Sequence, residues 1–387
     1  MLAALGSAVA KADDGDVLAV WRTGVKIHPV CPDAEVHTIH TYFNTSPESP
    51  DGRYVLYFRS MAADAGVGQI CIIERATGKQ TVLASNVFVT DAHSVAGQQW
   101  VNGGRTVVFK DKRDDHWLVV AVDIDTGRER ILARERLIGF GQPNANIVPL
   151  FGPYWQLNEH RDLELLDVTT GQIQTGVTND AVRAAFPDWI KENYGDHPTS
   201  IFFGILSPNL KRVIFKLSTP SSGNMQSADS STRGGLICYD LEQKKFLPIQ
   251  KEWGHPAWYK DSKTIVQMHD FLINSDTGEV SKIPGLPFYY SSHPSSSPDG
   301  TIMLKDMAVP QPGIAEKDWK IRGIDLCDIR GNHELIIDQF DGSHGATSWR
   351  VSHPHPVFSA DGRRIYYNVS STQWTRLFVA EMPDASK

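Results

Sequence analysis

Three histidines stand at the same position of a repeated sequence pattern. His255, His293 and His355 each lie six residues before the aspartate of a turn, in the sequences YKDSK, SPDGT and SADGR. If the repeats are related by rotation, the three imidazoles converge on one region of the molecule. Neutral imidazole binds Mn, Fe, Co, Ni, Cu and Zn ions, and its pKa near neutrality also suits a general base. The pattern therefore predicts a functional histidine cluster with metal-binding or acid–base chemistry.

His353 adds a fourth imidazole two residues before His355, in the sequence SHPHPVF. Residues i and i+2 of an extended chain lie on the same face, and Pro354 and Pro356 favour an extended backbone here. We therefore expect the two rings to project side by side, as two nitrogen ligands of one cation would. The alternative is a polar channel in which the histidines contact only water.

His40 and His93 are further candidates for contact with a ligand. They lie in the segments before the first two turns, so we expect them near the mouth of the channel, with His37 close by. The third repeat has polar residues that we expect mainly to pack: Gln142, Asn144 and Tyr154. The inner strands carry no evident acidic pair of the glycosidase kind, and no GxSxG motif of a serine hydrolase occurs. These absences disfavour ordinary hydrolysis.

The turns that follow the histidines belong to a repeat that runs along the chain. Ser-Pro-Asp-Gly or a close variant occurs at Asp51, Asn209, Asp299 and Asp361, with degenerate copies near Gly103 and Asp261. A short apolar strand follows each turn, and Asp-Gly supplies the positive φ that a tight hairpin needs. The units are spaced by roughly 35 to 50 residues, which is typical of four-stranded propeller blades. The chain is therefore predicted to be all-β, a seven-bladed β-propeller with four-stranded blades.

We expect one domain over residues 1–387, because no other segment is large enough to form a second domain. A strand around residues 17–25 is expected to complete the last blade and close the ring. A short helical insertion is predicted at about 178–197, with a Thr or Asn cap. The predicted blades are 42–84, 91–133, 136–177, 198–249, 252–284, 291–340 and 352–383.

The charge and the cysteines exclude several classes of protein. The 387 residues carry a net charge of −7, whereas nucleic acids and anionic membranes require a basic surface. A small acidic ligand remains compatible if a metal ion or an arginine cluster provides a local positive centre. The four cysteines form no CxxC pair, and Cys71 and Cys238 are expected to be buried thiols. No apolar run is long enough to cross a bilayer, and the N-terminal apolar stretch lacks a basic region, so we expect a cytoplasmic protein, with the periplasm as the alternative.

Several motifs resemble those of the oligogalacturonate lyase family of β-propellers. They are HPHPVFSADGRRIYY, GHPAWYKDSKTI and SSHPSSSPDGTIMLKD, and the opening segment HTYFNTSPESPDGRYVLYF is similar to that family's first blade. The resemblance covers most of the chain at the level of the repeat pattern. HPHP is the most specific motif, because PD40-type turns also occur in TolB-like and peptidase propellers.

The resemblance implies a metal-dependent enzyme, typically with Mn²⁺, that cleaves short 4-linked uronic-acid chains such as pectin fragments by β-elimination. It assigns His293, His353 and His355 as metal ligands and His255 as the Brønsted base. One position departs from the family, because Arg350 replaces a glutamine three residues before the HxH pair. This removes a potential oxygen ligand and gives Arg350 a potential role in binding the substrate carboxylate.

The predicted function is therefore that of a polysaccharide lyase acting on acidic oligosaccharides. A metal ion on the uronate carboxylate stabilises the enolate-like state, and an imidazole removes the C5 proton. Two alternatives remain open at this point. One is a non-catalytic PD40/TolB-like binding or scaffold propeller, and the other is a metalloenzyme that acts on a different acidic sugar.

Overall fold

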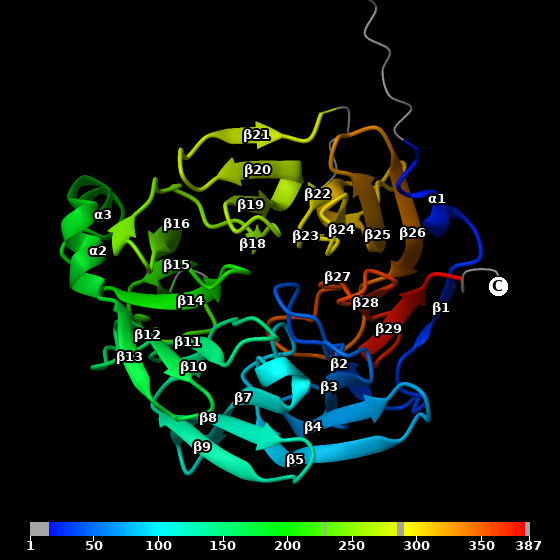
Figure 1. Cartoon of the computed structure of the whole chain (residues 1–387), viewed down its shortest axis with the longest axis horizontal. Coiled ribbons are helices and arrows are strands. Elements are labelled where there is room, and N and C mark those ends of the chain that lie inside the picture. Colours follow the sequence, from blue (N-terminus) through cyan, green and yellow to red (C-terminus); the bar gives the residue numbers. More distant parts are fainter. Residues whose placement is uncertain (1–14, 228–229, 285–289, 384–387) are drawn as a thin grey trace, which may run out of the picture.

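The computed structural model describes residues 15–227, 230–284 and 290–383. Small antiparallel sheets stand around a central axis, and the chain runs around the ring from its N-terminal to its C-terminal part (Figure 1). Within the described residues the strands form seven blades with four strand positions each. The predicted all-β β-propeller is therefore confirmed, and the strand pairing is consistent with the predicted seven blades.

The first four blades follow one another in the sequence. Blade one consists of β2 (His37–Ile39), β3 (Tyr54–Ser60), β4 (Val67–Glu74) and β5 (Gln80–Phe88). Blade two consists of β6 (Gln99–Val101), β7 (Thr106–Arg113), β8 (His116–Asp123) and β9 (Glu129–Arg134). Blade three consists of β10 (Leu137–Ile138), β11 (Ile147–Phe151), β12 (Leu163–Asp167) and β13 (Ile173–Val177). Blade four consists of β14 (Ser200–Leu206), β15 (Arg212–Ser218), β16 (Arg233–Asp240) and β17 (Lys245–Phe246).

The last three blades contain the aligned histidines. Blade five consists of β18 (Ala257–Trp258), β19 (Thr264–Gln267), β20 (Phe271–Asn274) and β21 (Val280–Lys282). Blade six has β22 (Tyr290–Ser291) and β23 (Ser295–Ser296) at its first position, then β24 (Ile302–Ala308), β25 (Ile321–Asp328) and β26 (Glu334–Asp341). Blade seven consists of β27 (Val357–Phe358), β28 (Arg364–Val369), β29 (Arg376–Glu381) and, from the N-terminal region, β1 (Lys26–Pro29). The short strands β18, β23 and β27 border the centre of the ring (Figure 1).

The ring closes between its last and first blades. β1 pairs antiparallel with β29 as the outermost strand of blade seven, and Thr38 of β2 pairs with Arg376 of β29. The predicted closure by an N-terminal strand therefore occurs, but it uses residues 26–29 rather than the region around 17–25. Part of that region is a short helix, α1 (Ala19–Arg22), which buries Trp21.

The recurring turn has the same geometry in several blades, which explains why its sequence recurs. In blade one the Ser49 hydroxyl donates to Oδ1 of Asp51 (2.6 Å), and the same oxygen accepts the backbone N–H of Arg53 (3.1 Å). The glycine between Asp51 and Arg53 has φ 73°, a conformation that glycine adopts without strain. Equivalent hydrogen bonds form around Asp299 and Asp361.

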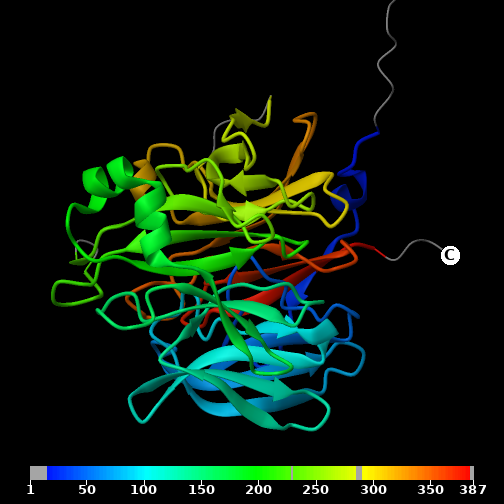
Figure 2. The same cartoon turned by 60° about the vertical axis from the view of Figure 1, so that its left-hand side comes forward.

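The predicted insertion between blades three and four is helical. It contains α2 (Asn179–Ala185) and α3 (Pro187–Tyr194), which lie at the outer edge of the ring in both views (Figures 1 and 2). The Thr178 side chain accepts a hydrogen bond from the N–H of Ala181, as expected of an N-cap residue. Trp189 and Tyr194 bury their rings among the apolar residues of β14, β15 and β16, so the helices cover the outside of blade four.

Apolar side chains fill the space between neighbouring blades. Between blades one and two, for example, Trp100 packs with Leu56 and Val107 and donates its indole N–H to the carbonyl of Pro47 (2.7 Å). All four cysteines are buried and unpaired, which confirms the prediction of buried thiols at Cys71 and Cys238. Short 3₁₀ turns occur at η1 (Asn102–Gly104), η3 (Met268–Asp270) and η4 (Glu316–Asp318).

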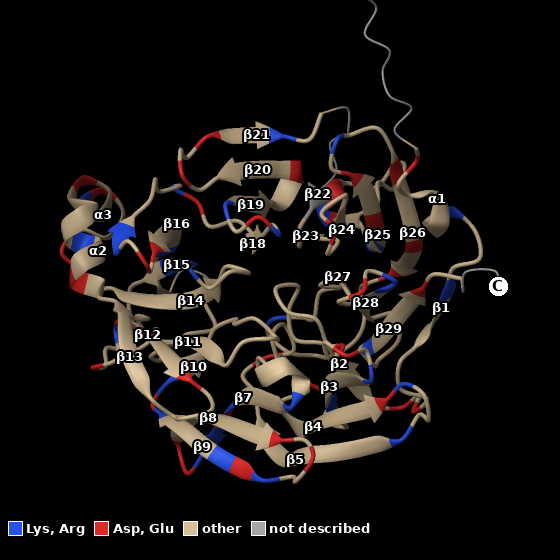
Figure 3. Ribbon diagram, viewed as in Figure 1, with Lys and Arg blue, Asp and Glu red and all other residues tan. Residues whose placement is uncertain are grey.

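Charged residues of both signs alternate along the outer strands and turns of the ring (Figure 3). Among the described residues no helix is long and apolar enough to cross a bilayer.

Candidate metal centre and adjoining cavity

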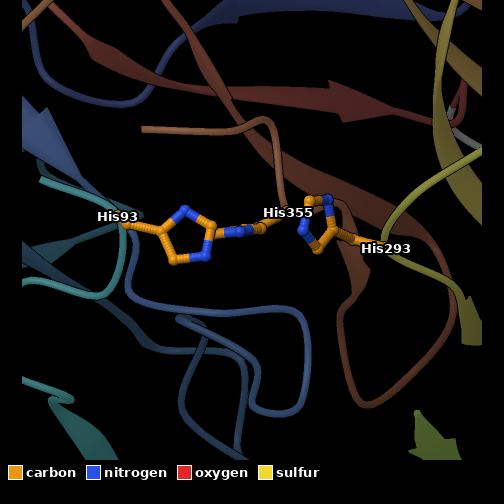
Figure 4. Close-up of side chains that lie close together, drawn as sticks. All are labelled: His93, His293 and His355. Atoms are coloured by element: carbon orange, nitrogen blue, oxygen red, sulfur yellow. The ribbon is translucent and has the colours of Figure 1, made fainter. Parts of the chain in front are cut away.

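Three buried histidines from different parts of the ring meet at its centre. His93 comes from the loop between β5 and β6, His293 lies between β22 and β23, and His355 precedes β27. When one ring nitrogen is taken from each histidine, the three nitrogens lie within 4.8 Å of one another. Figure 4 shows the three rings converging from three separate segments. This trio includes His93, which the sequence predicted only as a residue that contacts substrate.

His353 lies against the same trio. Its ring centroid is 4.9 Å from that of His93, 5.1 Å from that of His293 and 5.9 Å from that of His355. Among the described residues the group that could share an ion consists of His93, His293 and His355, so it contains two of the three predicted ligands and adds His93. The ring of the third predicted ligand, His353, packs against these three.

The backbone at the HxH motif differs from the prediction. His355 has φ 47°, which is the left-handed region that non-glycine residues rarely adopt, and residues 353–356 are not part of a strand. The expectation of an extended chain with both rings on one face is therefore wrong. The rings still converge because the chain bends between them, and strain of this kind is typical of functional sites.

The bent segment is held by Asn368 of β28. The Asn368 side chain donates to the carbonyls of His353 (3.1 Å) and His40 (3.0 Å) and accepts the N–H of His40 (2.9 Å). The backbone N–H of Asn368 also donates to the carbonyl of Pro354 (2.8 Å). A single buried amide thus ties the HxH segment to the end of β2.

Asp306 of β24 orients His293. Its carboxylate lies 2.9 Å from Nδ1 of His293 and also accepts the backbone N–H of that residue (2.8 Å). Burial raises the pKa of Asp306, but the charge and hydrogen bonds of His293 outweigh this effect and lower the pKa to about 2. The ionised carboxylate therefore holds a proton on Nδ1 and leaves Nε2 of His293 free, as carboxylates commonly do for metal-binding histidines.

His93 is oriented in a similar way by a backbone carbonyl. Nδ1 of His93 lies 3.3 Å from the carbonyl oxygen of Val351, which can only accept. This contact leaves Nε2 of His93 for a ligand. The segment that carries Val351 crosses from blade six to the first two blades, where Thr347 donates to Ala63 (2.9 Å) and Trp349 donates to Thr90 (3.1 Å).

The nitrogens at the centre are suited to a metal ion. Nε2 of His293 and both ring nitrogens of His355 are buried and have no hydrogen-bond partner among the described residues. Burial lowers the pKa of His353 to about 3 and the pKa values of His93 and His355 well below the ordinary value. The rings of His93, His353 and His355 are thus neutral at pH 7, which is the form that binds metals. Unsatisfied buried nitrogens are costly, and a transition-metal ion would satisfy several of them together.

His255 lies beside this centre rather than within the trio. Its ring centroid is 4.4 Å from that of His293, its Nδ1 has no hydrogen-bond partner among the residues that the structure describes, and the ring borders the cavity described below. Its backbone N–H donates to Oε1 of Gln267 (2.6 Å). Position 254 favours glycine, because its φ is 59° and a Cβ there would lie 2.5 Å from that same oxygen. Burial, followed by the charge of His293, lowers the pKa of His255 to about 3.

A cavity of about 160 Å³ opens next to the histidines. Four cationic side chains line it, together with one carboxylate, Asp91: they are Lys110, Lys216, Arg233 and Arg350. Aromatic rings form much of the remaining wall, among them Trp117, Tyr154, Trp155, Phe202, Phe203 and Trp253. The local positive centre that an acidic ligand requires is therefore present, in a chain whose net charge is −7. Flat rings and cations together suit a charged sugar.

Some predicted residues lie elsewhere. His40 is fully buried and does not line the cavity, and its Nε2 has no hydrogen-bond partner in the described part of the chain. His37 accepts the N–H of Thr375 at Nδ1 (3.0 Å), which is a structural contact. Gln142 donates to the carbonyl of Leu206 (2.8 Å), in agreement with the packing role expected for it. Tyr154, in contrast, borders the cavity.

The sequence did not indicate Asp306, Lys110, Lys216 or Arg233 as residues of the site. Lys216 and Arg233 stand on β15 and β16 of blade four, where no histidine drew attention to the inner face. Asp306 was present in the motif TIMLKD. Its role depends on the pairing of β24 with the segment that carries His293, and pairing in register was not used in the prediction.

Two solved structures of oligogalacturonate lyases are similar to this chain over nearly its full length. One is a complex with manganese, with a TM-score of 0.64, 15% identity and 94% of each chain covered. The other is from Vibrio parahaemolyticus, with a TM-score of 0.64, 14% identity, and 95% of this chain and 96% of that chain covered. A putative TolB from Agrobacterium tumefaciens aligns less well, with a TM-score of 0.41 and 12% identity over 93% of this chain. Comparisons with family models and with curated protein sequences found no match. The chain therefore has the propeller fold of the oligogalacturonate lyases.

Proposed function

We propose that this protein is a metal-dependent lyase that cleaves 4-linked uronic-acid oligosaccharides by β-elimination. The observation that carries the proposal is the combination of buried imidazoles, several of whose nitrogens have no partner among the described residues, with a cavity lined by four cations and by aromatic rings. Imidazoles alone would suit many metalloproteins. The adjoining cations specify an acidic ligand, and the rings suit the flat face of a sugar.

The proposed ligands of the metal are His93, His293, His353 and His355. A divalent cation bound there, with Mn²⁺ as the first candidate, would act as a Lewis acid on a substrate carboxylate and so acidify the neighbouring C–H bond. Within the chain, Asp306 and the carbonyl of Val351 keep the rings of His293 and His93 in the tautomers that present Nε2.

His255 is the proposed base for the C5 proton. Its ring is neutral at pH 7 and borders the cavity, and its Nδ1 has no partner in the described segments, so a proton can be accepted there. A bound uronate places negative charge beside the ring, which raises the proton affinity of a base. Arg350, in the same cavity, is the proposed contact for the carboxylate of the unit that loses its proton.

The test combines metal analysis with an ultraviolet assay for the conjugated double bond of the unsaturated uronate product. The expected result is that wild-type protein purifies with or takes up Mn²⁺ and produces the chromophore from oligogalacturonate. His293→Ala should lose both metal and activity, whereas His255→Ala should keep the metal and lose activity. His116→Ala is the matched control, because that side chain is exposed and pairs with Glu135 on the outer surface.

The outcomes separate the candidate functions. Chromophore from glucuronides or from rhamnose-linked uronides, but not from galacturonides, would identify a lyase for another acidic sugar. Metal binding without product from any of these substrates would contradict the lyase function and favour a binding propeller.

A further inference from the structure

The proposed base, His255, follows a glycine whose two flanking peptide groups are both bonded to one side chain. Gln267 of β19 accepts the backbone N–H of His255 at Oε1 (2.6 Å) and donates from Nε2 to the carbonyl of Trp253 (2.7 Å). The same Oε1 accepts the N–H of Met268 (3.0 Å), which ties the amide to its own backbone. The Gln267 amide therefore spans Gly254 and holds the peptide group on each side of it.

Rotation of the backbone at Gly254 would move the ring of His255. Glycine has the widest conformational freedom of all residues, and Gly254 adopts φ 59° with its Cα close against the Gln267 amide. Residues 252–256 lie outside the strands of blade five. The two hydrogen bonds from Gln267 therefore provide the restraint that strand pairing provides elsewhere in the blade.

Two cavities border this segment. Trp253, Gly254 and His255 line the cavity beside the histidines. Gly254 also lines a second cavity of about 440 Å³, together with Lys251 and Gln267. Close packing fixes most side chains in a protein interior, but a segment that borders two cavities has fewer neighbours to pack against. Hydrogen bonds must therefore contribute more to the position of this segment.

The ring of His255 has few contacts that could fix it independently of its backbone. Its Nδ1 has no hydrogen-bond partner among the described residues, and its ring centroid lies 4.4 Å from that of His293 and 6.4 Å from that of Phe43. A general base must lie within hydrogen-bond reach of the proton that it removes, and a displacement of about 1 Å can reduce the rate by about 100-fold. The backbone position set by Gln267 is therefore important for the reaction.

We propose that Gln267 is a positioning residue, which places His255 for proton transfer by holding the peptide groups on both sides of Gly254. The inference rests on the proposed function, because it requires His255 to be the base. None of the hydrogen bonds of the Gln267 side chain reaches a proposed metal ligand. Gln267 thus acts on the base and not on the metal centre.

The experiment compares three substitutions at this contact with one matched control. Gln267→Met removes both hydrogen bonds and nearly keeps the volume of the side chain. Gln267→Glu keeps an acceptor, but the introduced carboxyl can donate to the carbonyl before Gly254 only when it is protonated. Gly254→Ala disturbs the same contact from the other side. The control is Gln250→Met, because Gln250 lines the second cavity but donates to the carbonyl of Gly278 (2.9 Å).

In Gln267→Met and Gly254→Ala, kcat for oligogalacturonate is expected to fall by about 10–100-fold, as misplacement of a base implies. KM and Mn²⁺ content should change by less than about twofold. The activity of Gln267→Glu relative to wild type at the same pH should rise as the pH falls, because the protonated carboxyl restores both hydrogen bonds. Hydrogen exchange of the amides of residues 253–256 should be faster in Gln267→Met than in wild type or Gln250→Met.

A double substitution tests whether Gln267 acts through His255. In a His255→Ala background, Gln267→Met should not lower the residual rate further, because the base that it positions is already absent. An equal fall in both backgrounds would overturn the inference. A kcat of Gln267→Met within about twofold of wild type would also overturn it, as would a loss of Mn²⁺ from that variant.

Two further outcomes are decided separately. If Gln267→Met does not fold, the pH dependence of Gln267→Glu decides, and a ratio to wild type that does not change with pH would overturn the inference. Wild-type protein that holds Mn²⁺ but forms no product from any acidic oligosaccharide would contradict the proposed function, and the role assigned to Gln267 would be lost with it.

Discussion

Asp306→Asn is a sharp test of how the site is built. The substitution keeps the size of the side chain and an oxygen that can accept the backbone N–H of His293, a bond of 2.8 Å. It removes the negative charge that faces Nδ1 of His293 at 2.9 Å. An amide can also present its NH₂ group to that nitrogen and so favour the tautomer with the proton on Nε2. In that tautomer His293 cannot bind a metal through Nε2.

The loss of such an orienting carboxylate typically reduces metal affinity by about 10–100-fold, which corresponds to about 1.4–2.7 kcal/mol. We expect a loss in this range for Asp306→Asn, because the carboxylate is buried and, within the described residues, forms an ion pair only with His293. The dissociation constant for Mn²⁺ is measured by competition with a chelator. Asp338→Asn is the control, since Asp338 is also a hydrogen-bonded carboxylate but accepts from Tyr367 (2.7 Å) away from the histidines.

The pH dependence of the free energy of unfolding provides a second test of the role of Asp306. The folded pKa of Asp306 is depressed to about 2, so its contribution is present above the pKa of the unfolded chain, near 4. It is lost as the pH falls through the folded value. Metal-free wild type should therefore lose more stability between about pH 4 and pH 2 than Asp306→Asn does. Equal Mn²⁺ affinity in Asp306→Asn, Asp338→Asn and wild type would refute the reasoning about the tautomer.

Three further predictions concern the cavity and the metal. Arg350→Gln should weaken uronate binding by about tenfold through loss of a bidentate contact, while the added amide oxygen maintains or improves Mn²⁺ affinity. A decrease in Mn²⁺ affinity without a change in uronate binding would contradict the role proposed for Arg350. Burial, Arg350 and Arg233 lower the pKa of Lys216 to about 7, and a bound carboxylate raises it, so digalacturonate binding above pH 7 should take up a proton. Calorimetry in buffers of different ionisation enthalpy measures this uptake, which should be absent in Lys216→Arg. Mn²⁺ affinity should fall less between pH 7 and pH 5 than at a site of ordinary histidines, because burial lowers the pKa of His353 to about 3 and protons therefore compete weakly with the metal for its ring. A steep fall in Mn²⁺ affinity over that range, measured by chelator titration, would contradict the burial argument.

The fold was predictable because the turn chemistry is local. The hydrogen bonds of Ser49 and Asp51 are repeated around Asp299 and Asp361, so the sequence repeats wherever this hairpin does. His293 and His355 were found by the same logic, since they occupy one position relative to that turn. The location of the closing strand was less accurate, because its apolar pattern does not distinguish a strand at 17–25 from the short helix and the later strand β1.

The parts of the site that were missed depend on contacts between distant segments. His93 lies in a loop between blades one and two. Its place beside His355 depends on the segment with Trp349 and Val351, which runs from blade six to the first two blades and contacts Thr90 and His93. Asp306 reaches His293 only through the folding of blade six. The conformation of His355 was predicted wrongly. The flanking prolines favour an extended chain locally, but His355 has φ 47° and the segment is held by the tertiary contact of Asn368 with the carbonyl of His353.

These observations explain how a weakly acidic chain can contain a locally positive cavity. The net charge is −7, and charged residues of both signs lie along the outer strands and turns (Figure 3), where water and salt screen them beyond about 10 Å. The cavity is lined by four cations and one carboxylate and is partly enclosed by aromatic rings, so its charges act at short range in a less polar environment. The site is also made from segments that meet only when the ring is closed, since His93 and His355 belong to its opposite ends in sequence and Asn368 joins the HxH segment to β2. A ligand that contacts both the histidines and blade four therefore bridges the ring across its centre. Its binding free energy stabilises the closed propeller relative to the unfolded chain.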